Sequence, residues 1–378
     1  MKHLLVTNDF PPKVGGIQSY LWELWRRLPA DEFSVLATRY EGDKAWDDQQ
    51  PFEVRRTKQW WLLPTRKLVA EINATAKATG AELVVLDPVV PLGLVGPRLD
   101  LPYVAIAHGA EYVIPARLRP SRPFVARVTR NASGIVASGD YVASAVRKML
   151  ASANVPVVSI PPGVDSDRFH PLADDERREV RERFGVPQNA QLIVGVSRLV
   201  PRKGFDRLIE AAAMLRGTHP ALQVLIAGKG REQKDLERLI EKHDAPVRLL
   251  GRVPDADLPS LYGAADAFCM PCHDRWFGLE AEGFGIVFCE ASATGTPPIA
   301  GLSGGSGEAV IHGRTGLVVD APVTARSVAD AIASMFGDEP RRLSMGTAGR
   351  ERSATDYSYD QLARRLHGFL GTIRPQKE

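Results

Sequence analysis

Short apolar runs alternate along the chain with longer stretches whose apolar residues recur at helical spacing. Four runs in the first half are expected to form strands: Leu4–Val6, Leu83–Leu86, Tyr103–Ala107 and Ile135–Ala137. After the first run, one face of a helix is marked by Ile17, Leu21, Leu24, Trp25 and Leu28. Apolar strands that alternate with helices are typical of parallel sheets covered on both faces.

The same alternation restarts at Leu192. Six further runs are expected to form strands: Leu192–Val196, Val224–Ala227, Arg248–Leu250, Ala267–Met270, Pro298–Ala300 and Leu317–Val319. Between the two series, regular structure is interrupted by Pro161, Pro162, Gly163 and Pro171. The sequence therefore predicts an α/β chain of two doubly wound, Rossmann-like domains, with ligands bound at the carboxyl ends of the strands.

The break between the two series also gives the expected domain limits. A chain of 378 residues exceeds what one hydrophobic core usually supports. We expect an N-terminal domain at residues 1–165 and a C-terminal domain at residues 166–357. The final stretch, about residues 358–378, carries a helical stripe and is expected to pack back on the N-terminal domain.

Charge and hydropathy exclude several classes of protein. The net charge is only +3, from 48 basic and 45 acidic residues, so no overall field attracts nucleic acid. The first apolar run stops at Val6, which is too short for a signal-peptide core. No segment approaches the roughly 20 consecutive apolar residues of a membrane-spanning helix. We therefore expect a cytoplasmic protein.

The three cysteines are too few for a disulfide framework. Cys269 and Cys272 form a C-x-x-C pair, which could bind a metal or act in redox chemistry. Cys269 lies inside an apolar run, however, and no second ligand pair with zinc spacing exists. We expect plain buried thiols at these positions and at Cys289.

The first candidate for chemistry is the segment Asn8–Ile17, between the first strand and the first helix. Gly15 and Gly16 let backbone N–H groups approach an anion at the start of that helix. The segment is not a G-x-G-x-x-G motif, and no P-loop occurs in the chain, which argues against an ATPase. A tight turn is the alternative reading of the paired glycines.

The second candidate is Ser197–Gly204, the matching loop of the second half. It carries Arg198, Arg202 and Lys203. Three cations on one strand-to-helix loop repel one another unless an anion neutralises them, and an Arg–Lys pair suits a diphosphate. A solvated basic loop is the alternative.

The third candidate is the segment from Glu282 to Glu290. Gly283 and Gly285 favour a loop at Glu282 and a helix that contains Glu290. Free N–H groups from Phe284 to Val287 would then point at a ligand anion. Glu282 could accept sugar hydroxyls and Glu290 could bind a ribose diol, although acidic residues near a helix start also stabilise the helix itself.

The remaining candidates are one histidine and two pairs of aspartates. His108 follows the strand Tyr103–Ala107 and is expected to face the crevice at the carboxyl ends of the strands. A structural role is the alternative for a single histidine. The pairs Asp165–Asp167 and Asp255–Asp257 could bind a divalent metal beside a diphosphate. Each pair sits where a turn or a helix cap is expected, so we interpret both as structural.

Taken together, these residues resemble the family 4 glycosyltransferases of the GT-B fold over essentially the whole chain. Glu282 and Glu290 match the family signature, and Arg198 and Lys203 match its phosphate-binding pair. Four segments look most like actinobacterial phosphatidylinositol mannoside mannosyltransferases, which use GDP-mannose: residues 6–20, 161–165, 282–288 and 290–295.

The resemblance implies a retaining hexosyltransferase that needs no metal or other cofactor. It implies transfer of α-mannose from GDP-mannose to a glycolipid of the phosphatidylinositol mannoside type. The catalytic residues implied are Arg198, Lys203, His108 and Glu282. The donor-binding residues implied are Gly16, Arg198, Lys203, Arg252, Val253, Glu282, Gly283, Phe284, Gly285, Ile286, Val287 and Glu290.

Each of these residues has an implied role. Gly16 would contact the pyrophosphate, and Arg198 and Lys203 would stabilise the leaving GDP. Glu282 and the N–H groups that follow it would hold the mannose, and Glu290 would bind the ribose. The main chain near Arg252 and Val253 would read the base. His108 would contact the transferred sugar or the acceptor.

Two departures from the family pattern leave other functions open. Residues 108–111 read His-Gly-Ala-Glu where close mannoside transferases read His-Gly-His-Glu, and residues 304–308 read Gly-Gly-Ser-Gly-Glu instead of Gly-Gly-Ala-Pro-Glu. The first departure lies on the acceptor side. One alternative is a UDP-sugar-dependent transferase of the same fold acting on a soluble acceptor, either a small polyol such as a cyclitol or a secondary metabolite. Another is a catalytically silent protein that binds nucleotide sugars.

Two segments of the first half place aromatic or basic side chains together. Residues 58–67 combine Trp60 and Trp61 with Lys58, Arg66 and Lys67. The second segment contains five arginines: Arg117, Arg119, Arg122, Arg127 and Arg130. Aromatic residues beside cations suit an anionic lipid surface, and scattered surface arginines are the alternative. Peripheral association with the inner face of the plasma membrane is therefore a hypothesis.

Overall fold

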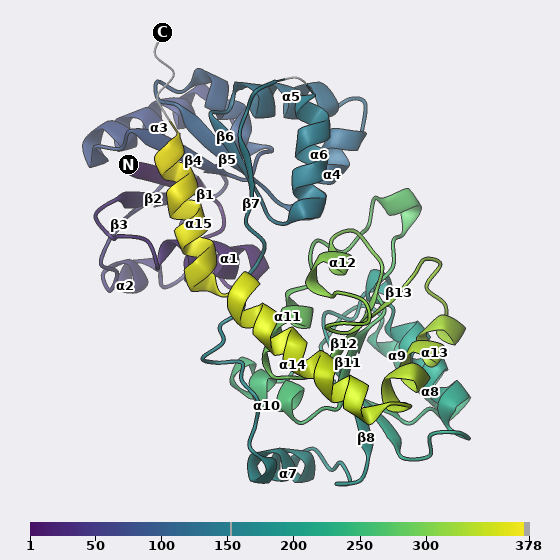
Figure 1. Cartoon of the computed structure of the whole chain (residues 1–378). Helices are drawn as coiled ribbons and strands as arrows, with labels where there is room; N and C mark the ends of the chain where they lie inside the picture. The colour runs from purple at the N-terminus through teal and green to yellow at the C-terminus, as the bar shows by residue number, and fades with distance from the viewer. Residues whose placement is uncertain (152, 374–378) are drawn as a thin grey trace. The chain divides into compact units, whose positions relative to one another are not determined.

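A computed structural model describes residues 1–151 and 153–373 of the chain. The chain divides into two compact units, each built around one parallel sheet (Figure 1). Unit 1 contains Met1–Pro162 and the C-terminal segment from Tyr359, and unit 2 is Gly163–Ser358.

The sheet of unit 1 has seven strands in the order β3-β2-β1-β4-β5-β6-β7. Their bounds are β1 His3–Thr7, β2 Phe33–Ala37, β3 Glu53–Arg56, β4 Leu83–Asp87, β5 Tyr103–Ala107, β6 Gly134–Ala137 and β7 Val157–Ser159. All of the pairings are parallel. Successive side chains of a strand point to opposite faces, so Leu4 and Val6 join one core and Leu5 joins the other.

Helices cover both faces of this sheet. One face packs against α1 Gly16–Trp25 and α15 Tyr359–Thr372, which contact each other (Figure 1). The other packs against α3 Arg66–Thr79, α4 Gly109–Arg117, α5 Arg122–Asn131, α6 Asp140–Leu150 and the 3₁₀ segment η1 Leu92–Arg98. The short helix α2 Asp43–Asp47 precedes β3.

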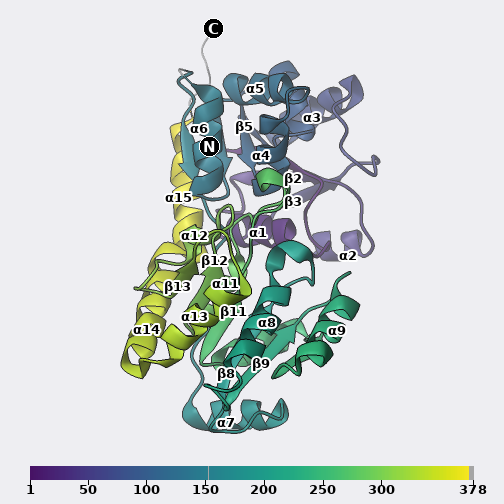
Figure 2. The ribbon, with the colours of Figure 1, turned by 90° about the vertical axis from the view of Figure 1, so that its right-hand side faces the viewer.

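Unit 2 repeats the plan with six parallel strands in the order β10-β9-β8-β11-β12-β13. They are β8 Gln191–Val196, β9 Leu222–Ala227, β10 Val247–Gly251, β11 Ala267–Met270, β12 Pro298–Gly301 and β13 Leu317–Val319. The helices are α7 Asp174–Arg183, α8 Phe205–Leu215, α9 Gln233–His243, α10 Leu258–Gly263, α11 Ile286–Ala293, α12 Ser306–Ala309, α13 Ala325–Phe336 and α14 Glu339–Asp356. Figure 2 shows α8 and α9 beside β8 and β9, and α11 packs against α14.

The strand orders place a topological switch point in each sheet. In unit 1 the order reverses between β1 and β4, and in unit 2 it reverses between β8 and β11. Ligands of doubly wound sheets bind outside the carboxyl ends of the strands at such points. The loops after β1, β4, β8 and β11 are therefore the first place to look for a site.

The predicted α/β class with two doubly wound sheets is confirmed, and every expected strand is present within a few residues of its predicted limits. Three strands of unit 1, β2, β3 and β7, were not predicted. The edge strand β3 reads Glu-Val-Arg-Arg and has no buried residue, so it lacks the apolar signal of the central strands. The first helix ends at Trp25, so the predicted inclusion of Leu28 is wrong, because the chain turns there.

The C-terminal helix α15 is part of unit 1. It ends at Thr372, and residues 374–378 of the expected final stretch lie outside the described residues. The three cysteines are free and buried, as predicted.

We expect α15 to be an integral part of the core of unit 1. Leu366 is fully buried on its inner face. Leu366→Ala should lower the free energy of unfolding of unit 1 by about 2–5 kcal/mol, because it removes buried methyl groups and leaves a cavity. Denaturant unfolding of the full chain measures this loss. The exposed neighbour provides the control: a similar loss in Arg365→Ala would contradict this role for α15.

Candidate functional site

The loop between β8 and α8 places a buried lysine at the switch point of unit 2. Lys203 is only 7% exposed and ends the short 3₁₀ segment η2 Pro201–Lys203. Gly204 follows with a left-handed φ of 72°. A side chain at Gly204 would meet the carbonyl oxygen of Pro271, after β11, at 2.1 Å. The glycine thus lets the β8 loop lie against the β11 loop, which fixes the position of Lys203.

Lys203 forms a buried ion pair with Glu282. Its Nζ lies 2.7 Å from Oε2 of Glu282, and the two side chains are 9% and 10% exposed. The guanidinium group of Arg202 lies 4.0 Å from the same Glu282 oxygen and 3.6 Å from Oε1 of Glu280. Nε of Arg202 is buried and has no hydrogen-bond partner in the described chain. The cluster therefore retains an unused donor beside its cations.

Hydrogen bonds and close contacts with glycines hold the backbone of Glu282 in place. Its N–H donates to Oγ of Ser303 at 3.0 Å, and its carbonyl accepts the N–H of Gly305 at 3.0 Å. A side chain at Gly304 would meet that carbonyl oxygen at 2.1 Å. The Gly304–Gly305 pair of this chain is thus explained by the close approach of two backbones.

Helix α11 presents unpaired N–H groups next to this ion pair. As predicted, Glu282 lies in the loop, α11 begins at Ile286 and Glu290 lies inside the helix. Gly285 has a left-handed φ of 84° at the N-cap. The N–H groups of residues 284–287 find no acceptor among the described residues. With the helix dipole, they form a positively polarised surface that favours an anion.

Glu290 lies on the next turn of α11 and contacts α10. It accepts a hydrogen bond from the hydroxyl of Tyr262 at 2.8 Å. Burial raises the pKa of Glu290 to about 7, and the Tyr262 hydrogen bond opposes that rise. The carboxyl group therefore changes charge near neutral pH.

The other donor-binding candidates of unit 2 lie on neighbouring loops at the same edge of the sheet. Arg198 follows β8, is exposed and has no ion-pair partner within the described chain. Arg252 and Val253 follow β10, with Arg252 exposed. Because the strands are parallel, these loops follow the carboxyl ends of the strands, as do the loops that carry Lys203 and Glu282.

In unit 1, the switch point holds a histidine and a buried aspartate. His108 follows β5 and is 8% exposed, and its Nε2 lies 2.6 Å from Oδ1 of Asp87, at the end of β4. Asp87 is fully buried and accepts a hydrogen bond from Thr7 at the end of β1. Burial alone would lower the pKa of His108, but the neighbouring carboxylates, Asp87 foremost, together outweigh this effect and the net pKa is raised. The Asp87 carboxylate also fixes the orientation of the ring.

Gly16 is the first residue of α1 and meets no atom within 4 Å where a side chain would begin. The space next to the Gly16 α-carbon is therefore open to a ligand. The predicted residues thus gather in two groups. The first lies in unit 2 around Lys203 and Glu282, and the second lies in unit 1 around His108 and Gly16.

The aspartate pairs have structural contacts. Asp165 accepts the N–H groups of Asp167 and Arg168, which closes a turn. Asp255 pairs with Arg168 at 2.8 Å, and Asp257 pairs with Arg183 at 3.2 Å. Asp257 stands at the N-cap of α10, but its side chain makes no capping hydrogen bond, so the expected cap is replaced by an ion pair.

Sequence reasoning missed three supporting residues or pairs. Asp87, which orients His108, ends an apolar strand and carries no local motif. Tyr262 lies 28 positions before Glu290. Gly228 and Gly230 let the loop after β9 lie against the Ser197–Leu199 backbone, and the G-x-G spacing after a strand was the one available signal.

A strained aromatic turn near the site was also missed. Trp276 and Phe277 have positive φ values of 48° and 57° in a turn closed by backbone hydrogen bonds between Arg275 and Glu280. Their side chains are 62% and 106% exposed. A left-handed conformation costs about 1–2 kcal/mol for a residue with a side chain. Two exposed aromatic residues held in this way make the turn a candidate functional element.

Two family models match the chain. Residues 14–168 match the model described as Glycosyltransferase Family 4, and residues 176–352 match the one described as Glycosyl transferases group 1.

Curated relatives match nearly full length. A GDP-mannose-dependent alpha-(1-6)-phosphatidylinositol monomannoside mannosyltransferase of Mycobacterium tuberculosis is 38% identical, over 97% of each chain. A GDP-mannose-dependent monoacylated alpha-(1-6)-phosphatidylinositol monomannoside mannosyltransferase of Corynebacterium glutamicum is 32% identical, over 98% of this chain and 97% of its own.

Solved structures share the fold. Anabaena HepE in complex with UDP superposes with a TM-score of 0.83 at 22% identity, covering 99% of this chain and 100% of its own. Sucrose-phosphate synthase of Thermosynechococcus elongatus gives 0.77 at 22% identity, covering 98% of each chain. These similarities, together with the two parallel sheets expected of the GT-B fold and the Glu282–Glu290 motif at the start of α11, identify the chain as a member of glycosyltransferase family 4.

Proposed function

We propose that this protein transfers α-mannose from GDP-mannose to a glycolipid of the phosphatidylinositol mannoside type, with retention of configuration and without a metal. The buried Lys203–Glu282 pair beside the open N–H groups of α11 is the observation that supports this most strongly. It combines a cation for a leaving phosphate with a carboxylate for sugar hydroxyls. The relatives at 32–38% identity are named for this donor and acceptor.

The proposed reaction exchanges one bond at the anomeric carbon. The bond from C1 of mannose to the β-phosphate oxygen breaks, and an acceptor hydroxyl forms a new bond to C1 on the same face. The hydroxyl proton passes to the departing phosphate, so that GDP leaves. Lys203 and Arg198 stabilise the negative charge that grows on the diphosphate, which is the role that a metal ion serves in other transferases.

The remaining residues hold the substrates. Glu282 and the N–H groups of residues 283–287 bind the mannose, and Glu290 binds the ribose diol. Gly16 leaves room for the pyrophosphate, and the backbone at Arg252 and Val253 contacts the base. His108, oriented by Asp87, contacts the transferred sugar or the acceptor.

A surface of unit 1 supports peripheral binding to an anionic membrane. Trp60 is 84% exposed and Leu63 is 48% exposed, and Lys58, Arg66 and Lys67 beside them are exposed as well. Leu62 is buried between them, and its N–H bonds to Asn8. The five arginines of residues 117–130 are exposed, and so are Leu118 and Phe124 of the same segment.

Both segments adjoin the helices that cover one face of the unit 1 sheet. Among the described residues, no helix is long and apolar enough to cross a membrane. Exposed aromatic residues within a basic surface favour binding in the headgroup region of anionic lipids.

The proposed activity is tested by incubating the full chain with GDP-mannose or UDP-sugars, together with phosphatidylinositol mannosides or free cyclitols, in EDTA. We expect mannosylated lipid by mass spectrometry only with GDP-mannose and the lipid acceptor. Transfer from a UDP-sugar to a cyclitol would replace the proposal with the small-acceptor alternative. Activity that appears only after addition of Mg²⁺ or Mn²⁺ would disprove the metal-free mechanism.

Lys203→Ala should lower kcat on the order of a hundredfold while weakening donor binding much less. The charge that Lys203 neutralises grows as the glycosidic bond breaks, so its loss falls mainly on the transition state. Steady-state kinetics and GDP-mannose binding measure the two effects, and a thermal melt verifies folding. Lys234→Ala, an exposed lysine on α9, is the matched control. A folded Lys203→Ala variant with normal turnover would rule out this role.

Donor affinity should depend on pH through Glu290. The ionised carboxylate accepts the ribose hydroxyls, and its pKa of about 7 means that the fraction ionised falls by about tenfold per pH unit below that value. The donor KM should therefore rise as pH falls from 8 to 6, with little change in kcat.

Two variants test this assignment. Glu290→Gln should bind the donor weakly, with a high donor KM that does not change with pH. Tyr262→Phe should move the midpoint to higher pH, because it removes the hydrogen bond that favours the ionised form. A wild-type pH profile in Glu290→Gln would show that another group titrates.

Membrane binding should require the exposed tryptophans of unit 1. In sedimentation with phosphatidylinositol-containing vesicles at low salt, Trp60→Ala/Trp61→Ala should bind severalfold more weakly than the unmodified chain, because apolar contact with the interface is lost. Salt at about 1 M should release the protein by screening the arginines and lysines. Trp276→Ala, an exposed tryptophan of unit 2, is the control. Equal losses in both variants would disprove a specific contact through unit 1.

A further inference from the structure

Arg202 lies beside the Lys203–Glu282 pair without a close partner for its guanidinium group. Its Nε is buried, lies 4.0 Å from Oε2 of Glu282 and has no hydrogen-bond partner among the described residues. Its Nη1 lies 3.6 Å from Oε1 of Glu280. Both distances exceed the roughly 2.7–2.9 Å of a hydrogen bond between charged groups. Arg202 therefore has an unused donor that faces a buried carboxylate.

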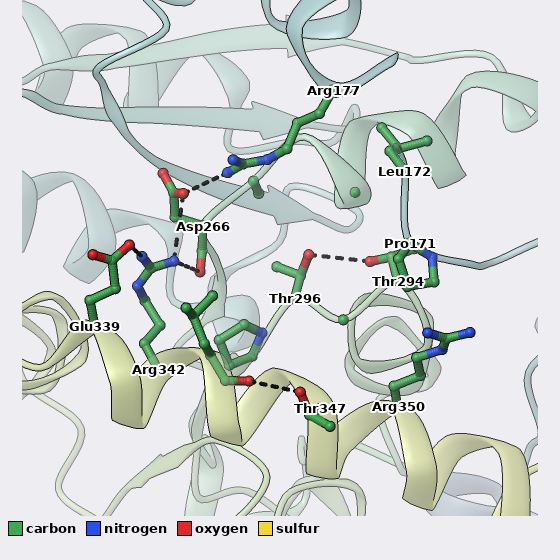
Figure 3. A pocket seen from close by; sticks show the side chains of 15 residues that line it. Pro171, Leu172, Arg177, Asp266, Thr294, Thr296, Glu339, Arg342, Thr347 and Arg350 are labelled. Carbon is green, nitrogen blue, oxygen red and sulfur yellow. Dashed lines mark hydrogen bonds and ion pairs between the residues drawn. The ribbon is translucent and has the colours of Figure 1, made fainter. Parts of the chain in front are cut away.

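A second arginine with a buried Nε provides a comparison. Nε of Arg342 also has no hydrogen-bond partner in the part of the chain that the structure describes. The other nitrogens of Arg342, however, donate to Glu339 at 3.0 Å and to the backbone oxygen of Asp266 at 3.4 Å (Figure 3). Those bonds fix the guanidinium group of Arg342. The shortest ion-pair distance of Arg202 is 3.6 Å, so its guanidinium group is not fixed in this way.

The side chain of Arg202 can change partner without a movement of the backbone. Its carbonyl oxygen accepts the N–H of His273 at 2.9 Å, which ties the β8 loop to the β11 loop. A shift of about 1 Å in the side chain would bring Nε within hydrogen-bond distance of Glu282. Glu280 would keep a partner, because Arg275 pairs with it at 2.9 Å.

Binding of a diphosphate would change the balance of charge at this cluster. Among the described residues, Lys203 and Arg202 are the cations within 4.0 Å of the Glu282 carboxylate, and only Lys203 is within hydrogen-bond distance. A diphosphate that approaches Lys203 brings further negative charge close to this buried carboxylate. The ammonium group can donate to both anions, but one positive charge cannot neutralise both, and an uncompensated buried charge is costly.

We propose that Arg202 is a positioning residue that becomes the counter-ion of Glu282 when a nucleotide diphosphate engages Lys203. The inference rests on the proposed function, since the diphosphate is that of the donor. Both cations approach Oε2 of Glu282, whereas Oε1 accepts no hydrogen bond within the described chain. The exchange therefore leaves Lys203 available for the phosphate and Oε1 of Glu282 available for a sugar hydroxyl.

Nucleotide binding to the full chain tests the exchange without an acceptor or a sugar. Calorimetry is performed with GDP and with UDP, and the tighter ligand is used, so that a wrong donor base does not affect the result. Arg202→Gln should weaken binding about tenfold, because a hydrogen bond between charged groups is lost in the complex. Arg202→Lys keeps the charge and should lose less. Unchanged binding in a folded Arg202→Gln variant would overturn the proposal.

A double-mutant cycle distinguishes positioning through Glu282 from direct contact with the phosphate. In a Glu282→Gln background no carboxylate remains to be neutralised, so Arg202→Gln should change the Kd by less than about twofold. A tenfold loss in both backgrounds would mean that Arg202 binds the phosphate itself, which would rule out the exchange. Arg341→Gln, an exposed arginine of α14, is the matched control and should bind normally.

A second cycle tests whether Arg202 serves only to hold Glu280. In a Glu280→Gln background, Arg202→Gln should still weaken nucleotide binding about tenfold. Loss of that effect would assign Arg202 to the Arg275–Glu280 turn and overturn the proposal. This cycle applies even if Glu282→Gln, which leaves Lys203 unpaired, does not fold.

The two levels of inference fail in different ways. Thermal melts without nucleotide verify that each variant is folded. If the unmodified chain binds neither GDP nor UDP, the proposed function fails together with the role of Arg202. If it binds one of them and either cycle gives the contrary result, only the role of Arg202 fails.

Discussion

The buried ion pair between Lys203 and Glu282 is the interaction on which the candidate site of unit 2 depends. Two charges removed from water are costly, and loss of one partner would cost about 3–5 kcal/mol because the other remains unpaired. The surrounding backbone is built to hold them: Gly204 admits the β11 loop, and Gly304 and Gly305 lie against the backbone of Glu282 and Gly283. Glu282 is the counter-ion of Lys203 in this structure. In the proposed reaction, a donor diphosphate would bring a second anion to the same lysine.

The two parallel sheets explain why chemistry concentrates at a few loops. Both faces of each sheet are covered by helices, so only strand ends remain accessible. In unit 1 the ends of β1, β4 and β5 bring together Thr7, Asp87 and His108. In unit 2 the loops after β8 and β11 bring together Lys203 and Glu282. At the opposite, amino ends of the strands of the second sheet, Asp266 pairs with Arg177 and Arg342.

Several local patterns were sufficient for prediction. The strands at the centre of each sheet are buried on both faces, so their apolar runs were visible without tertiary information. Gly285 allows the left-handed N-cap of α11, and this glycine separated a loop at Glu282 from a helix at Glu290. The edge strand β3 has no buried residue and gave no such signal.

The sequence by itself determined the α/β class, the central strands, the start of α11 and the family to which the chain belongs. Only the tertiary structure paired Lys203 with Glu282, which are 79 residues apart, and placed Asp87 against His108. It alone gathered Arg177 and Arg342 around Asp266. Local patterns report which faces are buried, because burial follows the period of a helix or strand. They do not report which charges meet, since this depends on the order in which distant strands assemble.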